Sequence, residues 1–182
     1  TERDGKVTPV PWIRIGDPQG VPTLLVLPTL RADAMTALML VMVTTVSLLV
    51  AVFASSYMKG DPGYPRFFAA ISAFVFSMCM LVLAGNFVLM FVFWEAVGLC
   101  SYLLIGFWFK KPSAAAAAKK AFVVNRIGDL GFILGIFMVW QTFDGSIDFD
   151  TIFGDPSVIA RVVTMQPEIL TTICVLLFVG AV

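Results

Sequence analysis

The sequence contains no histidine and only three cysteines among 182 residues. Cys79, Cys100 and Cys174 all fall inside apolar runs at unrelated spacings, which predicts small buried hydrophobic residues and neither a metal motif nor a disulfide framework. Without histidine, a zinc or haem site is disfavoured. The chain also lacks a glycine-rich phosphate loop and a nucleophile elbow, so it offers no candidate residues for chemistry on a covalent substrate.

Charge is scarce as well. Only 13% of the residues are charged, whereas 59% are hydrophobic, and the mean hydropathy is +0.95. The twelve basic and twelve acidic residues cancel, and nearly all of them lie in short segments between long apolar runs. This pattern excludes a soluble interaction module and is typical of a multi-span membrane protein.

A bilayer core about 30 Å thick requires roughly 20 apolar residues in a helix. The sequence predicts four complete spans and one truncated span, at about 34–57, 67–84, 87–109, 120–140 and 169–182. We therefore expect an all-α, polytopic transmembrane helix bundle over residues 34–182. Because the last run is too short to cross a bilayer, the chain is interpreted as an internal piece of a longer protein. The alternative is a short five-helix protein with a stubby last helix.

Residues 1–33 are polar and rich in proline, and the stretch 10–30 alternates short apolar runs with glycine and proline, which predicts a small hairpin outside the membrane. Ser113 is a plausible N-cap for the helix that contains Ala114 to Ala118. The region 141–168 is expected to be an acidic loop.

The charges also predict an orientation. If the spans alternate in direction, one face collects six basic residues against a single acid, Asp61, whereas the other face holds five basic and nine acidic residues. The basic residues of the first face are Lys59, Arg66, Lys110, Lys111, Lys119 and Lys120. Because basic residues near span ends favour the cytoplasmic side, we expect the first face to be cytoplasmic and residues 1–33 to be extracytoplasmic.

Glu95 lies about 12 Å along the third predicted span, at 1.5 Å per residue, where it cannot easily reach either surface. A carboxylate at the centre of a membrane helix costs about 2.5–3.5 kcal/mol on insertion scales. Burial favours the protonated form and a nearby cation favours the charged form, so such a group can load and release a proton. The alternative is a glutamate paired permanently with one cation to fix helix packing.

Arg126 and Asp129 are spaced i, i+3 in the fourth span and can pair on one helix face. They are candidates for the same relay, although a self-neutralising pair that lowers the insertion cost is an equal alternative. Lys120 is a further candidate near the helix entrance, where a lysine can also be an interfacial anchor. Gly131 and Gly135 form a G-x-x-x-G pattern that permits close helix approach.

The stretches FWEAVGLCSYLLIGFWF, residues 93–109, and KKPSAAAAAKKAFVVNRIGDLGF, residues 110–132, resemble the antiporter-like subunit of respiratory complex I. That subunit is called L in bacteria and 5 in mitochondria. The resemblance implies half of an inverted-repeat fold whose key glutamate corresponds to Glu95 and whose charged pair corresponds to Arg126 and Asp129. It also implies a partner lysine shortly after Val182, where the sequence ends.

The resemblance implies a proton-translocating membrane-arm subunit of NADH-quinone oxidoreductase in the bacterial cytoplasmic or mitochondrial inner membrane. The chain itself would bind no cofactor, because NADH, FMN, iron-sulfur clusters and quinone would belong to other subunits. Its expected partners are other membrane-arm subunits and the lipid bilayer, with no nucleic acid. The alternatives are a sodium/proton antiporter without redox coupling and a non-transporting membrane scaffold.

Overall fold

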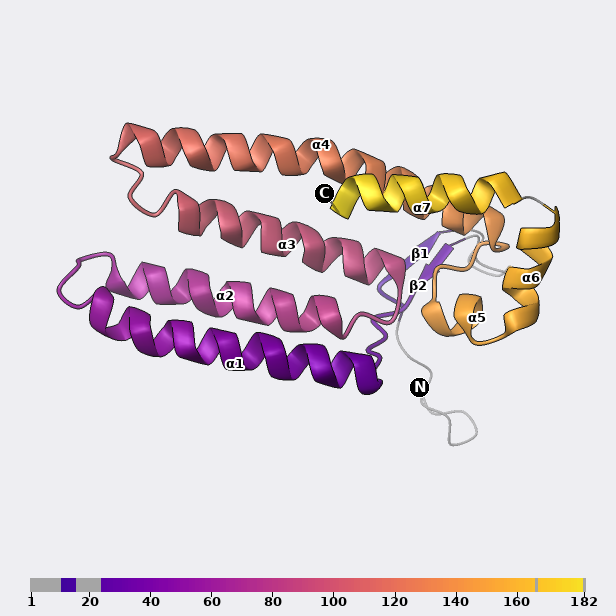
Figure 1. Cartoon of the computed structure of the whole chain (residues 1–182), viewed down its shortest axis with the longest axis horizontal. Coiled ribbons are helices and arrows are strands. Elements are labelled where there is room, and N and C mark those ends of the chain that lie inside the picture. The colour runs from indigo at the N-terminus through magenta and orange to yellow at the C-terminus, as the bar shows by residue number, and fades with distance from the viewer. Residues whose placement is uncertain (1–10, 16–23, 166, 182) are drawn as a thin grey trace.

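The computed structural model describes residues 11–15, 24–165 and 167–181. Four long helices lie side by side in a row, each antiparallel to the next (Figure 1). They are α1 (Ala34–Tyr57), α2 (Tyr64–Val82), α3 (Phe87–Ile105) and α4 (Pro112–Thr142). All four are long and apolar enough to cross a membrane, which confirms the predicted polytopic all-α fold.

The helix ends differ from the predicted ones for local reasons. Proline near the first position begins α2 at Tyr64 and α4 at Pro112, because proline at a helix start sacrifices no hydrogen bond. Both helices therefore begin before the apolar spans predicted from 67 and 120. The third span ends at Ile105 instead of 109, since the chain turns at Gly106. Ser113 was wrongly predicted as an N-cap: the cap position is Lys111, and Ser113 lies inside the first turn.

The region predicted as the acidic loop 141–168 contains two helices, α5 (Phe149–Phe153) and α6 (Pro156–Met165). They lead into α7 (Pro167–Ala181), which packs along the second half of α4 (Figure 1). Small residues make this contact close. A Cβ on Gly135 would lie 2.8 Å from Leu177 Cδ2, and one on Gly131 would lie 3.0 Å from Val179 Cγ1. The G-x-x-x-G pattern therefore lies at the interface between α4 and α7.

The main apolar core lies at one end of the row, where α3, α4, α5, α6 and α7 converge. Its buried members are Phe87, Phe132, Ile136, Val139, Phe143, Ile152, Val162 and Ile173. By contrast, α1 buries only Thr36 and Ala54 and leaves most of its apolar side chains exposed. A helix that is apolar on all sides suits a lipid environment or contact with further helices.

At the same end, β1 (Ile13–Ile15) and β2 (Leu24–Val26) pair antiparallel, with Ile13 opposite Val26. The turn that joins these strands, and Val182, lie outside the described residues. The cysteines do not behave alike: Cys100 is buried and Cys79 is half-buried, but Cys174 is exposed. The prediction that all three are buried is therefore wrong for Cys174, because α7 turns this position away from α4.

Asn86 holds the end of the bundle together and is fully buried, with 0% of its surface exposed. Its side-chain oxygen accepts a hydrogen bond from Leu89 N at 2.8 Å and so caps α3. Its amide nitrogen donates to Leu27 O at 2.7 Å and to Thr29 Oγ1 at 3.2 Å. One side chain thus links the segment after the hairpin to the start of the helix that carries Glu95.

Candidate functional site

Glu95 and Arg126 form an ion pair between α3 and α4. Glu95 is eight residues from the start of α3 and ten from its end, and Arg126 is likewise far from both ends of α4. The side chains retain 21% and 41% of their exposure, respectively. The structure therefore gives the half-buried carboxylate a cationic partner at mid-helix depth, which offsets part of the cost of placing it there.

Asp129 is the second carboxylate on the same guanidinium. Its Oδ2 lies 3.6 Å from Arg126 Nη1, and its side chain is only 10% exposed. The i, i+3 spacing on α4 brings these two together, as the sequence predicted. Arg126 also lies over the Phe122 ring, with 4.7 Å from Cζ to the ring centroid.

One cation thus bridges two carboxylates, a group we call the charged triad (Glu95, Arg126 and Asp129). With all three groups ionised, the triad carries a net charge of −1. The triad therefore has one more carboxylate than it has cations.

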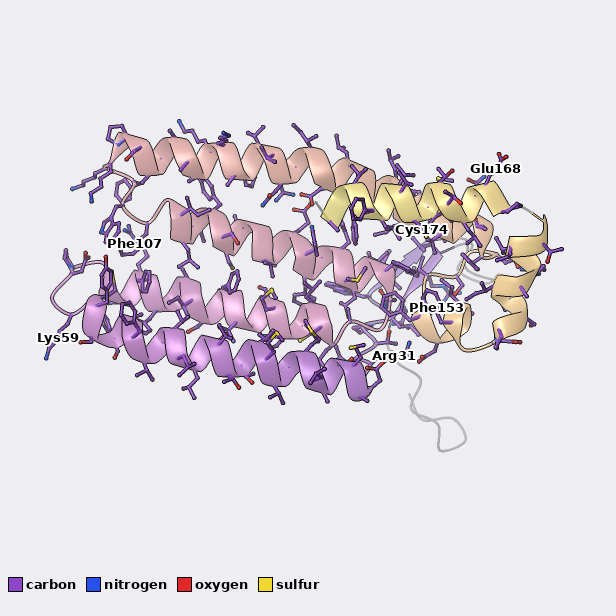
Figure 2. The ribbon with its side chains drawn as sticks, in the orientation of Figure 1. Arg31, Lys59, Phe107, Phe153, Glu168 and Cys174 are labelled. Carbon is purple, nitrogen blue, oxygen red and sulfur yellow. The ribbon has the colours of Figure 1, made fainter. Side chains whose placement is uncertain are left out.

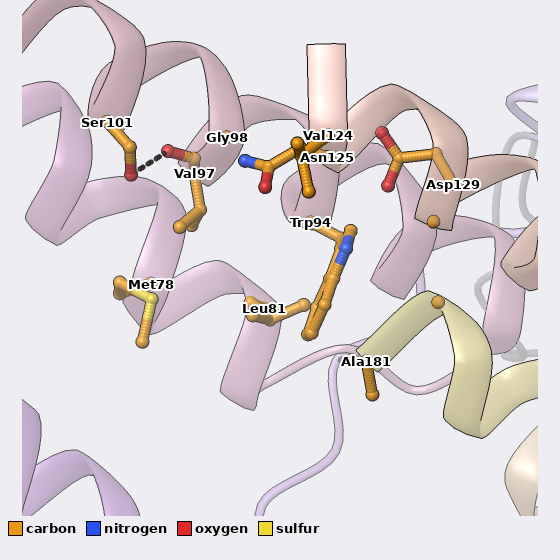
Figure 3. A pocket seen from close by; sticks show the side chains of 12 residues that line it. Met78, Leu81, Trp94, Val97, Gly98, Ser101, Val124, Asn125, Asp129 and Ala181 are labelled. Carbon is orange, nitrogen blue, oxygen red and sulfur yellow. Dashed lines mark hydrogen bonds between the residues drawn. The ribbon is translucent and has the colours of Figure 1, made fainter. Parts of the chain in front are cut away.

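A pocket of about 350 Å³ lies beside the triad. Figure 3 shows Asn125 and Asp129 from α4 projecting toward a space that Trp94 and Ser101 of α3 also border. Ser101 Oγ donates a hydrogen bond to Val97 O at 2.9 Å. A space of this size with several polar groups can hold water molecules, which are carriers of protons between side chains. Gly180 and Ala181 of α7 close one side.

Lys120 is not part of this arrangement. Six residues before Arg126 on α4, it lies about 9 Å away along the axis at 1.5 Å per residue, and its side chain is exposed. Among the residues that the structure describes, the ion pairs of Glu95 and Asp129 are with Arg126. A role for Lys120 in proton transfer therefore stays a prediction.

Sequence reasoning missed two polar residues that border the pocket, Ser101 and Asn125. The available signal was their position within apolar helices, since polar side chains in a membrane span usually face the bundle interior or a cavity. Sequence reasoning also missed Asn86 as the N-cap of α3. A Gly-Asn pair immediately before an apolar run is an N-cap signal that could have identified it.

Residues 84–182 match a family described as "NADH:quinone oxidoreductase/Mrp antiporter, TM". Residues 21–68 match a second, described as the N-terminus of chain 5 of NADH-ubiquinone oxidoreductase, complex I. The chain belongs to the complex I chain 5 family. This membership confirms the resemblance, and the family's antiporter-like transmembrane domain begins immediately before α3 and contains the whole charged triad.

Several relatives of the complex I chain 5 family are about half identical to this chain. NADH-quinone oxidoreductase subunit L of Neisseria meningitidis is 50% identical over 155 residues, which covers 82% of this chain and 23% of the relative. NADH-ubiquinone oxidoreductase chain 5 of Metridium senile is 46% identical over 84% of this chain and 24% of the relative. A chloroplastic NAD(P)H-quinone oxidoreductase subunit 5 of Zygnema circumcarinatum is 49% identical over 81% of this chain and 21% of the relative. The chain thus spans about a quarter or less of the length of these curated relatives.

Proposed function

We propose that this chain is part of a proton-translocating membrane-arm subunit of NADH-quinone oxidoreductase, in which Glu95 accepts and releases the transported proton. The observation that carries the proposal is the charged triad: two carboxylates share one guanidinium at the middle of two membrane helices. A permanent structural pair would need one acid for one base. The surplus acid is what a proton carrier requires.

The guanidinium is the element that changes partner in this proposal. When Arg126 moves toward Asp129, Glu95 loses its counterion, and its neutral, protonated form becomes favoured. When Arg126 returns to Glu95, the proton leaves. Either movement is small, because Arg126 already contacts both acids. Lys120 would supply a further cation that biases the cycle.

The pocket beside Asp129 supports a route for protons between the triad and the next carrier. It contains the amide of Asn125 and the hydroxyl of Ser101, both of which can bind water. Water bridging these groups would connect Asp129 to the region around Gly180 and Ala181. Because the route runs along α4 toward α7, it would extend from the triad to the C-terminal end of α7.

The redox reaction would take place elsewhere in the assembled complex. Partner subunits would bind NADH, FMN, iron-sulfur clusters and quinone. The free energy of the redox reaction would reach this chain through the movement of charged groups. The chain would lie in the bacterial cytoplasmic membrane or the mitochondrial inner membrane, with the basic loops around Lys59 and Lys110 on the cytoplasmic or matrix side and the hairpin on the opposite side.

The test is Glu95→Gln in the full-length subunit within the assembled complex, with proton release per electron as the readout. We expect NADH oxidation with fewer protons translocated, because glutamine keeps the shape of the side chain but cannot exchange a proton. Glu168→Gln is the matched control, since Glu168 is exposed in the first turn of α7 and lies far from the triad. Unchanged proton stoichiometry in Glu95→Gln would refute the proposal.

A sodium/proton antiporter without redox coupling is the second candidate, because the matching family's description also names Mrp antiporters. It would use the same glutamate. Purified full-length protein in vesicles discriminates the two: an antiporter exchanges sodium for protons without NADH, whereas a complex I subunit moves protons only when NADH is oxidised. If Glu95→Gln lowers the amount of assembled complex but leaves ion flux per complex intact, the chain is a membrane scaffold.

A further inference from the structure

The end of the bundle opposite the hairpin carries a second pocket, of about 600 Å³, that the charged triad does not use. Its walls come from the α1–α2 connection and the α3–α4 connection. The charged residues that line it are Asp61, Arg66, Lys110 and Lys111. Figure 2 labels Lys59 and Phe107 at this end and Arg31 and Phe153 at the other. We call this space the basic pocket.

The single acid of the basic pocket is already engaged. Asp61 Oδ1 accepts a hydrogen bond from Gly63 N at 2.6 Å, and Oδ2 lies 3.5 Å from the indole nitrogen of Trp108. Within residues 11–15, 24–165 and 167–181, none of the ion pairs involves Arg66, Lys110 or Lys111. The pocket thus presents cationic side chains without a carboxylate counterion.

These cations are positioned by aromatic rings and by backbone. Arg66 donates a hydrogen bond to Phe107 O at 3.0 Å and lies over the rings of Phe107 and Phe109, at 4.8 and 5.2 Å from Cζ to the centroids. Lys111 Nζ lies 4.9 Å from the Trp108 ring centroid. Such contacts orient a cation without neutralising it, so the charges remain available to an anion.

An apolar groove of about 470 Å³ adjoins the basic pocket. The two share Arg66, Phe107 and Phe109. Small side chains form much of the groove, which runs along α3 between α2 and α4: they are Ala69, Ala70, Ala73, Gly106, Ala115 and Ala118. The small residues leave a mainly apolar space that offers a hydrocarbon chain apolar contact, and Tyr102, Leu103 and Lys119 complete its lining.

The basic pocket and the apolar groove lie at the depths that the headgroup and the acyl chains of a phospholipid occupy in a bilayer. The basic pocket lies at the helix ends, with Arg66 in the first turn of α2 and both lysines beyond Ile105, where α3 ends. Its cations are therefore at the level of phospholipid headgroups. The groove extends from there into the length of the helices, at the level of the acyl chains. Charge above and small apolar residues below correspond to the two parts of one amphipathic molecule.

We propose that the basic pocket and the adjoining groove together bind one phospholipid with an anionic headgroup. Arg66, Lys110 and Lys111 contact its phosphate, and an acyl chain lies in the groove beside Ala115. Basic pockets between membrane helices recognise anionic headgroups in this way. Lysines that only orient the protein in the membrane would require neither a pocket nor a continuous groove. This site is independent of the role of Glu95.

The experiment uses the full-length subunit in its assembled complex, placed in nanodiscs of phosphatidylcholine that contain a photoactivatable phosphatidylglycerol. Peptide mass spectrometry then measures labelling of residues 107–119 as the phosphatidylglycerol fraction rises. We expect labelling to saturate at a lower fraction than with photoactivatable phosphatidylcholine. In Lys110→Gln/Lys111→Gln the apparent affinity should fall about thirtyfold, because each of the two cations near the surface contributes a factor of about five to six.

Two controls separate charge from side-chain identity and from position. Lys110→Arg/Lys111→Arg keeps both charges and should retain the affinity, which also shows that the altered loop folds. Lys59→Gln removes a charge at the same end that does not line the pocket, and it should have a much smaller effect.

The groove is tested by Ala115→Leu, which fills the acyl site, with Ala117→Leu as its matched control on the exposed side of the same turn. We expect labelling to fall in the first variant and to stay unchanged in the second. Equal labelling by phosphatidylcholine would overturn the proposal. So would displacement of the lipid by inorganic phosphate together with no effect of Ala115→Leu, since the pocket would then bind a free anion only.

Discussion

The ion pair between Glu95 and Arg126 makes a quantitative prediction about stability. Arg126→Gln removes the cation that serves both acids and leaves two carboxylates side by side within the helices. Breaking a buried pair costs about 3–5 kcal/mol. We expect the free energy of unfolding to fall by about 3 kcal/mol, at the lower end of that range, because the Arg126 side chain keeps 41% of its exposure and is partly solvated.

The double variant Glu95→Gln/Arg126→Gln decides whether the loss comes from the pair. Removing Glu95 as well leaves one carboxylate without a cation, Asp129, instead of two, so the two losses should not add. The coupling free energy is expected to exceed about 1 kcal/mol, in the upper part of the range of about 0.5–3 kcal/mol for residues in contact within one ionic network. The measurement is unfolding of the purified full-length subunit in mixed micelles titrated with SDS, for the wild type, both single variants and the double variant.

An exposed ion pair of the same chain provides a control double-mutant cycle. Arg161 Nη2 lies 2.8 Å from Asp144 Oδ2, but these side chains are 50% and 80% exposed. Their coupling free energy should be only about 0.2–1 kcal/mol, because solvent screens the attraction. If the cycle at Glu95 and Arg126 gives a coupling no larger than this control, the two side chains do not form a buried pair, and the reasoning behind the charged triad fails.

Two further predictions concern helix packing and pH. Gly135→Ala should lower the free energy of unfolding by about 1–3 kcal/mol, because the added Cβ would lie 2.8 Å from the Leu177 side chain of α7. In the control Gly98→Ala the nearest atom is 3.7 Å away, so the SDS concentration at the unfolding midpoint should stay unchanged. Equal midpoints for both variants would contradict the close contact between α4 and α7. Burial and, secondarily, repulsion from Asp150 raise the pKa of the Asp148 carboxyl above its ordinary value of 3.8. The folded state therefore binds this proton more tightly than the unfolded state, so stability should fall as the pH rises from the unfolded pKa through the raised folded pKa. In Asp148→Asn this part of the dependence of the unfolding free energy on pH should disappear, as measured by thermal unfolding at a series of pH values. If the variant and the wild type show the same dependence, the Asp148 carboxyl does not contribute to it.

The existence and type of the membrane helices could be predicted from the sequence alone. Hydropathy is a sum over neighbouring residues, so the spans starting at Ala34 and Phe87 required no knowledge of their partners. The i, i+3 relation of Arg126 and Asp129 is equally local, because it follows from the geometry of one helix. Two of the three members of the charged triad were therefore predictable as a pair.

The helix ends were less accessible to sequence reasoning. A window of apolar residues cannot indicate where a chain turns. The apolar span predicted from 120 is only part of α4, which begins at Pro112, two residues before the helix start that an N-cap at Ser113 predicts. The short helices α5 and α6 were missed for a related reason. They are held by burial of Ile152 and Val162 in the core, and that core is assembled from five different helices.

The sequence by itself determined that this protein spans a membrane several times, and that Glu95, Arg126 and Asp129 lie at a depth where charge is costly. Only the tertiary structure decided that Glu95 of α3 and Asp129 of α4 face the same guanidinium, and that the cations near Lys110 border a pocket continuous with an apolar groove. The physical reason is that a residue's depth depends on its place along its own helix. Its partner depends on how two helices are rotated and how closely they pack, and that is set by side chains distributed over the whole bundle.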